Sequence, residues 1–192
     1  MIPNIRAVIL AAGPPRRPGP LVPAADRPLL PRVAAEVCAA PVDGVAVVLG
    51  AAADERARSL AGLPVVLLRN PDWAEGAASS IRVATAWAER TRASGLLLCL
   101  CDHGWLGAPH VTRLIAAHHA SCRGLVASAY RGALGAPALF PRRLFPQLGA
   151  LSGDGGARDV IRSHHDAVAI DVPASACAID APAERAASAH GG

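Results

Sequence analysis

Two groups of side chains in this sequence could carry chemistry on a phosphate. The first lies in the segment LAAGPPRRPG, where an apolar run ends at Gly13 and Arg16 and Arg17 follow. A loop after a strand can turn backbone N–H groups toward a phosphate, and an arginine adds a two-pronged contact. The second is Asp102, at the end of the apolar run GLLLCLCD. A carboxylate in that position is either a Mg²⁺ ligand or a capping aspartate of the following turn.

These groups need a scaffold that brings strand ends together. Short apolar runs, typical of buried strands, span 5–12, 45–50, 64–70, 95–102, 124–130, 166–172 and 177–180. Stretches with helical spacing of apolar residues lie between them, at 28–40, 53–61, 77–92 and 108–120. This alternation predicts an α/β fold with a mostly parallel sheet, which binds ligands outside the carboxyl ends of its strands. The Gly- and Pro-rich stretch 131–159 breaks the rhythm, and we expect it to leave the sheet and return.

Composition narrows the function further. The chain has 192 residues with 19 arginines and no lysine, which excludes Schiff-base and P-loop lysine chemistry. The formal charge of +4 comes from scattered arginines, so it favours a small polyanionic ligand over nucleic acid. No apolar stretch is long enough for a membrane span and no signal peptide precedes the first strand, so we expect a cytoplasmic protein. The five cysteines lack CxxC spacing and predict reduced thiols.

Several other side chains allow two interpretations. Cys99 and Cys101 are either soft metal ligands or, as we favour, two small buried thiols on one strand face. Trp73 and Trp105 either form the wall of a ligand site or belong to the core. The histidines are predicted as exposed or capping residues rather than zinc ligands; they are His110, His118, His119, His164 and His165.

A series of segments resembles a known family in order and spacing: LAAGPPRRPG, RPLL, NPDWAEGAASSIR, LLLCLCD, GAPALF, LSGDGGAR and AIDAPAE. The family is that of the molybdenum cofactor cytidylyltransferases, within the wider group of MobA-like nucleotidyltransferases. The similarity covers nearly the whole chain, and the NPDW and GDGGAR segments are its most specific parts. LAAG resembles the cytidylyl branch more than the guanylyl branch, in which LAGG is usual.

The resemblance implies a Rossmann-like, three-layer nucleotidyltransferase fold that transfers CMP from CTP to molybdopterin with Mg²⁺. It also implies roles for residues. Catalysis falls to Arg17 and Asp102, and the metal to Asp102 and Asp180. The implied nucleotide-binding residues are Ala11, Ala12, Gly13, Arg16, Gly76, Ser79 and Ser80, and Gly135 and Asp154 lie on the acceptor side. The implied single domain covers 1–192, with a nucleotide-binding half (1–104), an acceptor half (105–185) and a tail (186–192).

The chain departs from the family's pattern in two places. Its first loop is shorter and lacks the usual lysine, so Arg16 and Arg17 are predicted as the only nearby cations, and prolines at 14, 15, 18 and 20 remove backbone donors. The usual GDQP turn reads CDHG, with His103 and Gly104 after Asp102.

Three hypotheses follow from this match and these departures. One is an active cytidylyltransferase. A second is a catalytically impaired relative that binds a nucleotide or cofactor and serves a molybdenum enzyme or its maturation factor. The third is nucleotidyl transfer to another phosphorylated acceptor.

Overall fold

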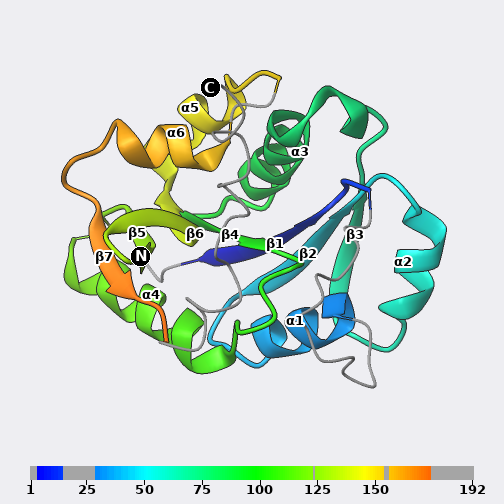
Figure 1. The fold of residues 1–192 in the computed structure, drawn as a ribbon, viewed down its shortest axis with the longest axis horizontal. Helices are drawn as coiled ribbons and strands as arrows, with labels where there is room; N and C mark the ends of the chain where they lie inside the picture. Colours follow the sequence, from blue (N-terminus) through cyan, green and yellow to red (C-terminus); the bar gives the residue numbers. More distant parts are fainter. Residues whose placement is uncertain (1–3, 15–28, 123, 154–155, 174–192) are drawn as a thin grey trace, which may run out of the picture.

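The computed structural model describes residues 4–14, 29–122, 124–153 and 156–173. These residues form a single sheet with helices on both faces (Figure 1). The strands are β1 (Ile5–Ala11), β2 (Gly44–Leu49), β3 (Val65–Arg69), β4 (Gly95–Leu100), β5 (Val126–Tyr130), β6 (Ala133–Pro141) and β7 (Val168–Asp171). The α-helices are α1 (Leu29–Cys38), α2 (Ala53–Ser59), α3 (Ala77–Arg90), α4 (Ala108–Ala120), α5 (Phe145–Gly149) and α6 (Ala157–Arg162). Two 3-10 turns, η1 (Trp73–Glu75) and η2 (Arg142–Leu144), precede α3 and α5.

The strand order is β3-β2-β1-β4-β6-β5-β7. From β1 the chain builds outward through β2 to β3, then crosses to place β4 on the other side of β1. All the pairings among these strands are parallel. The chain therefore reverses its direction of sheet growth between β1 and β4, and ligands of open α/β sheets bind at such a switch point. The predicted α/β fold with a mostly parallel sheet is confirmed.

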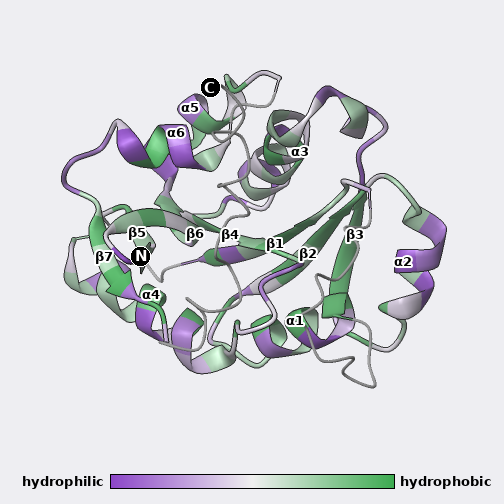
Figure 2. Ribbon diagram, in the orientation of Figure 1, coloured by the Kyte–Doolittle hydropathy of each residue, from purple (hydrophilic) through white to green (hydrophobic). Residues whose placement is uncertain are grey.

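Both faces of the central strands are buried, which explains why their sequences are continuous apolar runs. In β1, Ile5, Ala7 and Ile9 face one core layer while Val8 faces the other. The first layer lies under α1 and α4, and the second under α3, α5 and α6 (Figure 1). The hydropathy colours follow this arrangement, because the strands are green and polar colour is concentrated on the helices (Figure 2). Helix α2, at the β3 end of the sheet, has no buried residue.

The stretch after Tyr130 was expected to leave the sheet, and this prediction is wrong for its first part. Residues 133–141 form β6, which lies between β4 and β5 and is antiparallel to both. The reversal occurs at Arg131 and Gly132, whose φ values of 48° and 89° are both positive. A two-residue hairpin turn needs this conformation because it matches the twist of the strands that it joins. After β6 the chain does leave the sheet, through η2, α5 and α6, before β7.

A proline inside a central strand normally removes a ladder hydrogen bond, yet Pro137 lies inside β6. The register accommodates it, since Ala127 pairs with Ala138 while Ser128 pairs with Gly135. Ala136 and Pro137 therefore bulge out of the β5 ladder. The pairing of β6 with β4 also begins only at Ala138, so the end of β4 beyond Leu98 is not paired with β6.

The prediction of exposed or capping histidines on α4 is wrong for two of the three. His110 is 3% exposed and His118 is fully buried, whereas His119 is exposed. The Nδ1 atom of His118 is 2.7 Å from the carbonyl oxygen of Gly124, a contact that ties α4 to the start of β5. His164 is half-buried and His165 exposed, close to the expected surface positions. The predicted strand at 177–180 lies outside the described residues. Among the residues described, no helix combines the length and apolar character needed to span a bilayer.

Candidate active site

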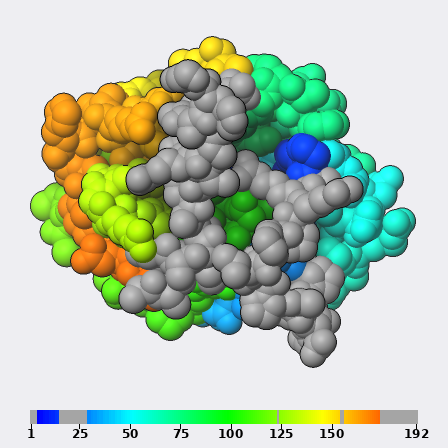
Figure 3. Space-filling view, viewed as in Figure 1, coloured from blue at the N-terminus to red at the C-terminus, as the bar shows by residue number. Residues whose placement is uncertain are grey.

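A cavity of about 740 Å³ opens at the carboxyl ends of β1 and β4, next to the switch point of the sheet. This volume is within the range of cavities that hold small-molecule ligands. Its walls come from the segment after β1, the start of α1, helix α2, the η1 turn, the first turn of α3 and the end of β4. In the space-filling view, the dark-blue atoms that follow β1 lie between the cyan region of α2 and the blue-green region of α3 (Figure 3).

The segment Ala11–Gly13 forms part of the cavity wall, and its three carbonyl groups are held from the β2–α2 connection and from helix α2. The N–H of Ala51 donates to the carbonyl of Ala12 at 2.8 Å. Arg56 Nη1 donates to the carbonyl of Ala11 and, at 2.8 Å, to that of Gly13. Among the described residues, a Cβ atom added to Gly13 would find no atom within 4 Å. The segment is therefore anchored to β2 and α2 on one side, and the described residues leave its cavity side open to a ligand.

Asp102 lies in the turn that follows β4, half-buried, and lines the cavity. Its carbonyl accepts a hydrogen bond from the N–H of Gly104 at 2.9 Å, and Arg32 of α1 donates to the carbonyl of Gly104. A Cβ on Gly104 would come within 2.9 Å of Arg32 Nη2 and 3.2 Å of Leu29 Cδ1. The close approach of these side-chain ends favours glycine in CDHG, and the hydrogen bond from Arg32 ties the turn that carries Asp102 to α1.

A buried amide organises the NPDW segment. Asn70 is 2% exposed, and its Nδ2 donates to the hydroxyl oxygens of Ser79 at 2.9 Å and Ser80 at 3.0 Å. Its Oδ1 accepts from the N–H of Asp72 at 3.0 Å. Ser79 in turn donates to the carbonyl of Gly76 at 2.9 Å, and Gly76 has a φ of 121°, a conformation that only glycine adopts easily. This network joins the end of β3 to the first turn of α3.

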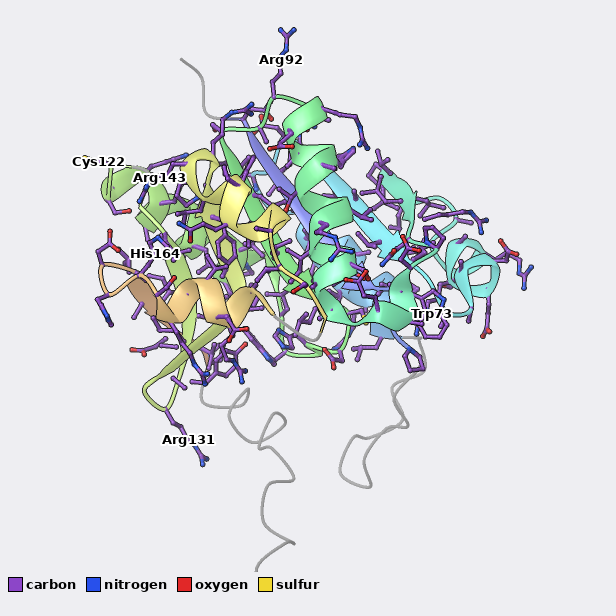
Figure 4. All side chains as sticks on the ribbon, turned by 90° about the horizontal axis from the view of Figure 1, so that it is seen from above. Trp73, Arg92, Cys122, Arg131, Arg143 and His164 are labelled. Atoms are coloured by element: carbon purple, nitrogen blue, oxygen red, sulfur yellow. The ribbon has the colours of Figure 1, made fainter. Side chains whose placement is uncertain are left out.

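Trp73 covers one side of the cavity entrance and packs on a glycine that sequence reasoning missed. A Cβ at Gly50 would come within 2.5 Å of Trp73 Cβ and 2.7 Å of the Ala12 carbonyl oxygen. In the side-chain view Trp73 and Arg131 come out on one side of the molecule and Arg92 on the opposite side (Figure 4). Since Trp73 lines the cavity at the carboxyl ends of the strands, Arg92 belongs to the end away from it.

An exposed ion pair ties the η1 turn to α3. Arg82 Nη1 and Nη2 contact Glu75 Oε1 at 2.8 Å and Oε2 at 2.6 Å, and Nη1 also donates to the carbonyl of Leu151 at 2.9 Å. The guanidinium of Arg82 holds the pKa of Glu75 below its ordinary value. Both groups are charged at neutral pH, so the pair crosslinks three segments around the cavity's outer rim.

The cavity brings together most of the predicted site residues that the structure describes. Its lining includes Ala11, Ala12, Gly13, Gly76, Ser80 and Asp102. Ser79 lies one layer behind, where it is 2% exposed and bonded to Asn70 and Gly76. Gly135 lies elsewhere, on β6, where an added Cβ would be 3.7 Å from Tyr130 Cε2. Four predicted residues lie outside the described residues, namely Arg16, Arg17, Asp154 and Asp180.

Helix α2 supplies a cation that no sequence motif marked. The prediction that Arg16 and Arg17 are the only nearby cations is wrong, because Arg56 lines the cavity. Helix α2 starts just after the carboxyl end of β2, which points to the same edge of the sheet as β1 and β4. That rule could have located Arg56. The spacing alone could not say which of the residues in DERARS faces the cavity.

A second group of polar and aromatic side chains lies beyond β4, under α4. Trp105 stacks on His103 with ring centroids 5.6 Å apart and meets His110 and Tyr130 edge-on at 5.0 and 5.9 Å. His110 Nε2 is 2.8 Å from the Ser128 hydroxyl, which donates to the carbonyl of Pro137 at 2.7 Å. The two tryptophans thus occupy different regions, Trp73 at the cavity and Trp105 in this cluster.

The protonation of His110 follows from its neighbours. Arg113 Nη2 lies 2.9 Å from His110 Nδ1 and can only donate, so Nδ1 accepts and Nε2–H donates to Ser128. Burial, aided by the positive charge of Arg113, lowers the pKa of His110 to about 4. The imidazole is therefore neutral at physiological pH.

The two strand cysteines differ in exposure. Cys99 is fully buried, and this burial raises the pKa of its thiol to about 12. The expectation of a buried thiol is confirmed for Cys99, whereas Cys101 is half-buried and lines the cavity. In the part of the chain that the structure describes, no three His, Cys, Asp or Glu side chains are grouped to hold a metal ion.

Similarity to known proteins points in the same direction as the geometry. Residues 7–168 match the profile of the MobA-like NTP transferase domain. No curated protein is similar enough in sequence to count as a match.

Solved structures share the fold. An Rv0371c homologue from Mycobacterium sp. strain JC1 is 34% identical, over 88% of this chain and 85% of that chain, with a TM-score of 0.70. Rv0371c from Mycobacterium tuberculosis H37Rv, solved as a complex with manganese, is 30% identical over 90% and 89%, with a TM-score of 0.68. The 4-diphosphocytidyl-2C-methyl-D-erythritol synthase of Anaerococcus prevotii is 13% identical over 90% and 88%, with a TM-score of 0.66, and this likeness is one of fold.

Proposed function

This chain belongs to the family of MobA-like NTP transferase domains, and from that premise we propose that it transfers CMP from CTP to the phosphate of molybdopterin. The observation that carries the proposal is the cavity at the switch point, where no described residue crowds Gly13 and Asp102 follows the neighbouring strand β4. The LAAG segment, which resembles the cytidylyl branch, supports cytosine as the base. Residues 1–104 would bind the nucleotide and residues 105–185 the acceptor.

In this reaction an oxygen of the acceptor phosphate forms a bond to the α-phosphorus of CTP. The bond from that phosphorus to the bridging oxygen breaks, and pyrophosphate leaves with the electron pair. Such a transfer needs alignment and charge neutralisation more than covalent catalysis. The anchored Ala11–Gly13 segment would align the base and phosphates, and Gly76 and Ser80 would contact the base and sugar. Asn70 would act through the serines, because it holds both hydroxyls in place.

The residues present fit a divalent ion. Mg²⁺ is usually held by one or two carboxylates together with substrate phosphates and water, so the carboxylate of Asp102, just after the end of β4 and in the cavity lining, suits it. Asp102 would hold the ion, with Asp180, outside the described residues, as its second ligand. The bound ion would neutralise charge on the phosphates. The manganese in Rv0371c supports a divalent metal in proteins similar to this one.

Binding and turnover test the proposal separately. We expect isothermal titration to detect CTP binding in the presence of Mg²⁺, with weaker binding of GTP and ATP. We expect pyrophosphate release from CTP when molybdopterin is added. Absence of Mg²⁺-dependent CTP binding would contradict the assignment of the cavity, and tighter binding of GTP would contradict the choice of nucleotide.

The first loop gives a specific reason to consider a second function. It lacks the family's lysine and contains prolines in place of backbone donors, which favours a relative that binds the nucleotide without turning it over. Such a protein would deliver or protect the cofactor of a molybdenum enzyme. Tight CTP binding without pyrophosphate release would support this function. Turnover with another phosphorylated acceptor, detected by mass spectrometry, would instead support the same chemistry on a different substrate.

A further inference from the structure

Arg56 connects the cavity to the loop that departs from the family's pattern. It projects from α2 and is half-buried, although no residue of that helix is fully buried. Its Nη1 atom donates to the carbonyls of both Ala11 and Gly13. An arginine that holds two carbonyls of one segment with a single nitrogen fixes that segment relative to the helix. The end of β1 therefore cannot shift without breaking contacts with Arg56.

Within the described residues, the rest of the guanidinium is available for a ligand. An arginine side chain has five N–H donors, and Nη1 supplies two of them. The described residues provide no acceptor for the donors of Nη2 and Nε, and Arg56 lines the cavity. A guanidinium in this position presents an edge with parallel N–H groups, which matches two oxygens of a phosphate.

The charges around the cavity favour a phosphate at that edge. Among the described residues that line the cavity, the charged side chains are Glu55, Arg56 and Asp102. Glu55 is exposed and precedes Arg56 on the helix, and Asp102 comes from the other side of β1. A triphosphate needs cationic neutralisation beyond a metal ion, and within the described lining only Arg56 supplies it. Because the first loop lacks the lysine that is usual in the family, the positive charge of Arg56 is needed to neutralise the triphosphate.

We propose that Arg56 is a triphosphate-binding residue of this protein, and that the cation usually carried by the loop is here carried by α2. The inference rests on the proposed function, because it assigns a residue to the same nucleotide site. Arg56 would do two things at once: Nη1 positions the Ala11–Gly13 segment, and Nη2 and Nε bind phosphate oxygens. A lysine is less suited to both tasks, since its three N–H donors share one nitrogen, whereas the five donors of arginine are spread over three nitrogens.

The test measures how the loss of affinity depends on the number of phosphates. Titrations of cytidine, CMP and CTP, each with Mg²⁺, are compared between the wild type, R56Q and R56K. R58Q is the matched control, because Arg58 is an exposed arginine of the same helix that does not line the cavity. We expect R56Q to bind CTP about 10- to 100-fold more weakly, as for loss of hydrogen bonds to a charged group. Cytidine affinity should be unchanged, and R56K should recover part of the CTP affinity.

Two results would overturn the inference. One is CTP affinity of R56Q equal to that of the wild type. The other is an equal loss for cytidine and CTP, which would mean that Arg56 acts only on the shape of the cavity. Because α2 contributes no fully buried residue, R56Q should fold, and its circular dichroism and melting temperature check this.

Inorganic tripolyphosphate separates this inference from the proposed function. If the wild type does not bind CTP, the proposed function is wrong, and the role of Arg56 is then decided by tripolyphosphate alone. Weaker tripolyphosphate binding by R56Q than by R58Q supports the triphosphate site. Equal binding by the two variants contradicts it.

Discussion

The two polar regions of this molecule use their hydrogen-bonding groups in opposite ways. Among the described residues, no atom crowds Gly13 at the cavity, and Arg56 has N–H donors beyond those bound to the backbone. Under α4, a directed chain runs from Arg113 through His110 and Ser128 to the carbonyl of Pro137. The difference indicates that the first region is prepared for a ligand, whereas the chain in the second region links α4, β5 and β6.

The largest effect is expected at Asp102, because the cavity residues are expected to affect catalysis and not the stability of the fold. We expect D102N to lower Mg²⁺-dependent pyrophosphate release by at least about 100-fold, since it removes a charge that acts on the reacting phosphates. Its melting temperature should stay close to that of the wild type, because the turn is held by main-chain contacts and Arg32. D166N, which changes an exposed aspartate outside the cavity lining, is the control. Unchanged turnover in D102N would contradict the assignment of the cavity as the catalytic region.

The next largest effect is a pH dependence of the free energy of unfolding that arises from His110 in the second region. The pKa of His110 is about 4 in the folded protein and near 6.5 in the unfolded chain. Between pH 6.5 and pH 4 the unfolded chain therefore binds a proton at this imidazole, whereas the folded protein does not, and unfolding becomes more favourable. Above pH 6.5 this term is constant. We expect the free energy of unfolding to fall by about 3 kcal/mol as the pH is lowered from 6.5 to 4.

Denaturant unfolding of H110Q and of H119Q tests the origin of this term. The H110Q variant should lose it, whereas H119Q, which changes an exposed histidine on the same helix, should keep it. An identical pH dependence in the wild type and H110Q would contradict the assignment of a neutral, buried imidazole.

A third prediction concerns Asn70, which combines a buried, structural position with contact to a residue of the cavity. This amide is buried, yet it supports Ser80, which lines the cavity. We expect N70A to lower the free energy of unfolding by about 2 kcal/mol, because it removes three hydrogen bonds and leaves buried groups without them. CTP affinity should also fall. If N70A is less stable but binds CTP as tightly as the wild type, Asn70 supports the fold and not the ligand site.

The smallest effect is expected at Tyr130, where the hydroxyl donates to the carbonyl of Ala136 at 2.5 Å. We expect Y130F to lower the free energy of unfolding by about 1 kcal/mol, the usual contribution of one hydrogen bond. CTP affinity, measured by titration, should not change. A loss of CTP affinity would extend the ligand site into the second region.

Sequence reasoning located helices α1 to α4 and the parallel strands because each carries a local signal, but it predicted neither α5 nor α6. Both faces of β1 and β4 are buried, so these strands appear as continuous apolar runs, and α4 begins and ends where its spacing predicted. It also placed Gly13 and Asp102 at strand ends that share one edge of the sheet. It failed for β6, since prolines and glycines resemble a loop, and only the bulge at Ala136 and Pro137 makes a central strand possible there.

The sequence by itself determined the class of fold, the family and the edge of the sheet at which the cavity lies, because these depend on periodicity and on motifs close in the chain. Tertiary structure decided which side chains meet. Arg56 contacts Gly13, and His110 contacts Ser128, through helices packed against strands distant in sequence. Burial, and with it the neutral state of His110, is likewise a property of the packed chain. The absence of lysine from the first loop can be seen in the sequence. That Arg56 on α2 lies close enough to replace this lysine becomes clear only when β1 and β2 are paired in the structure.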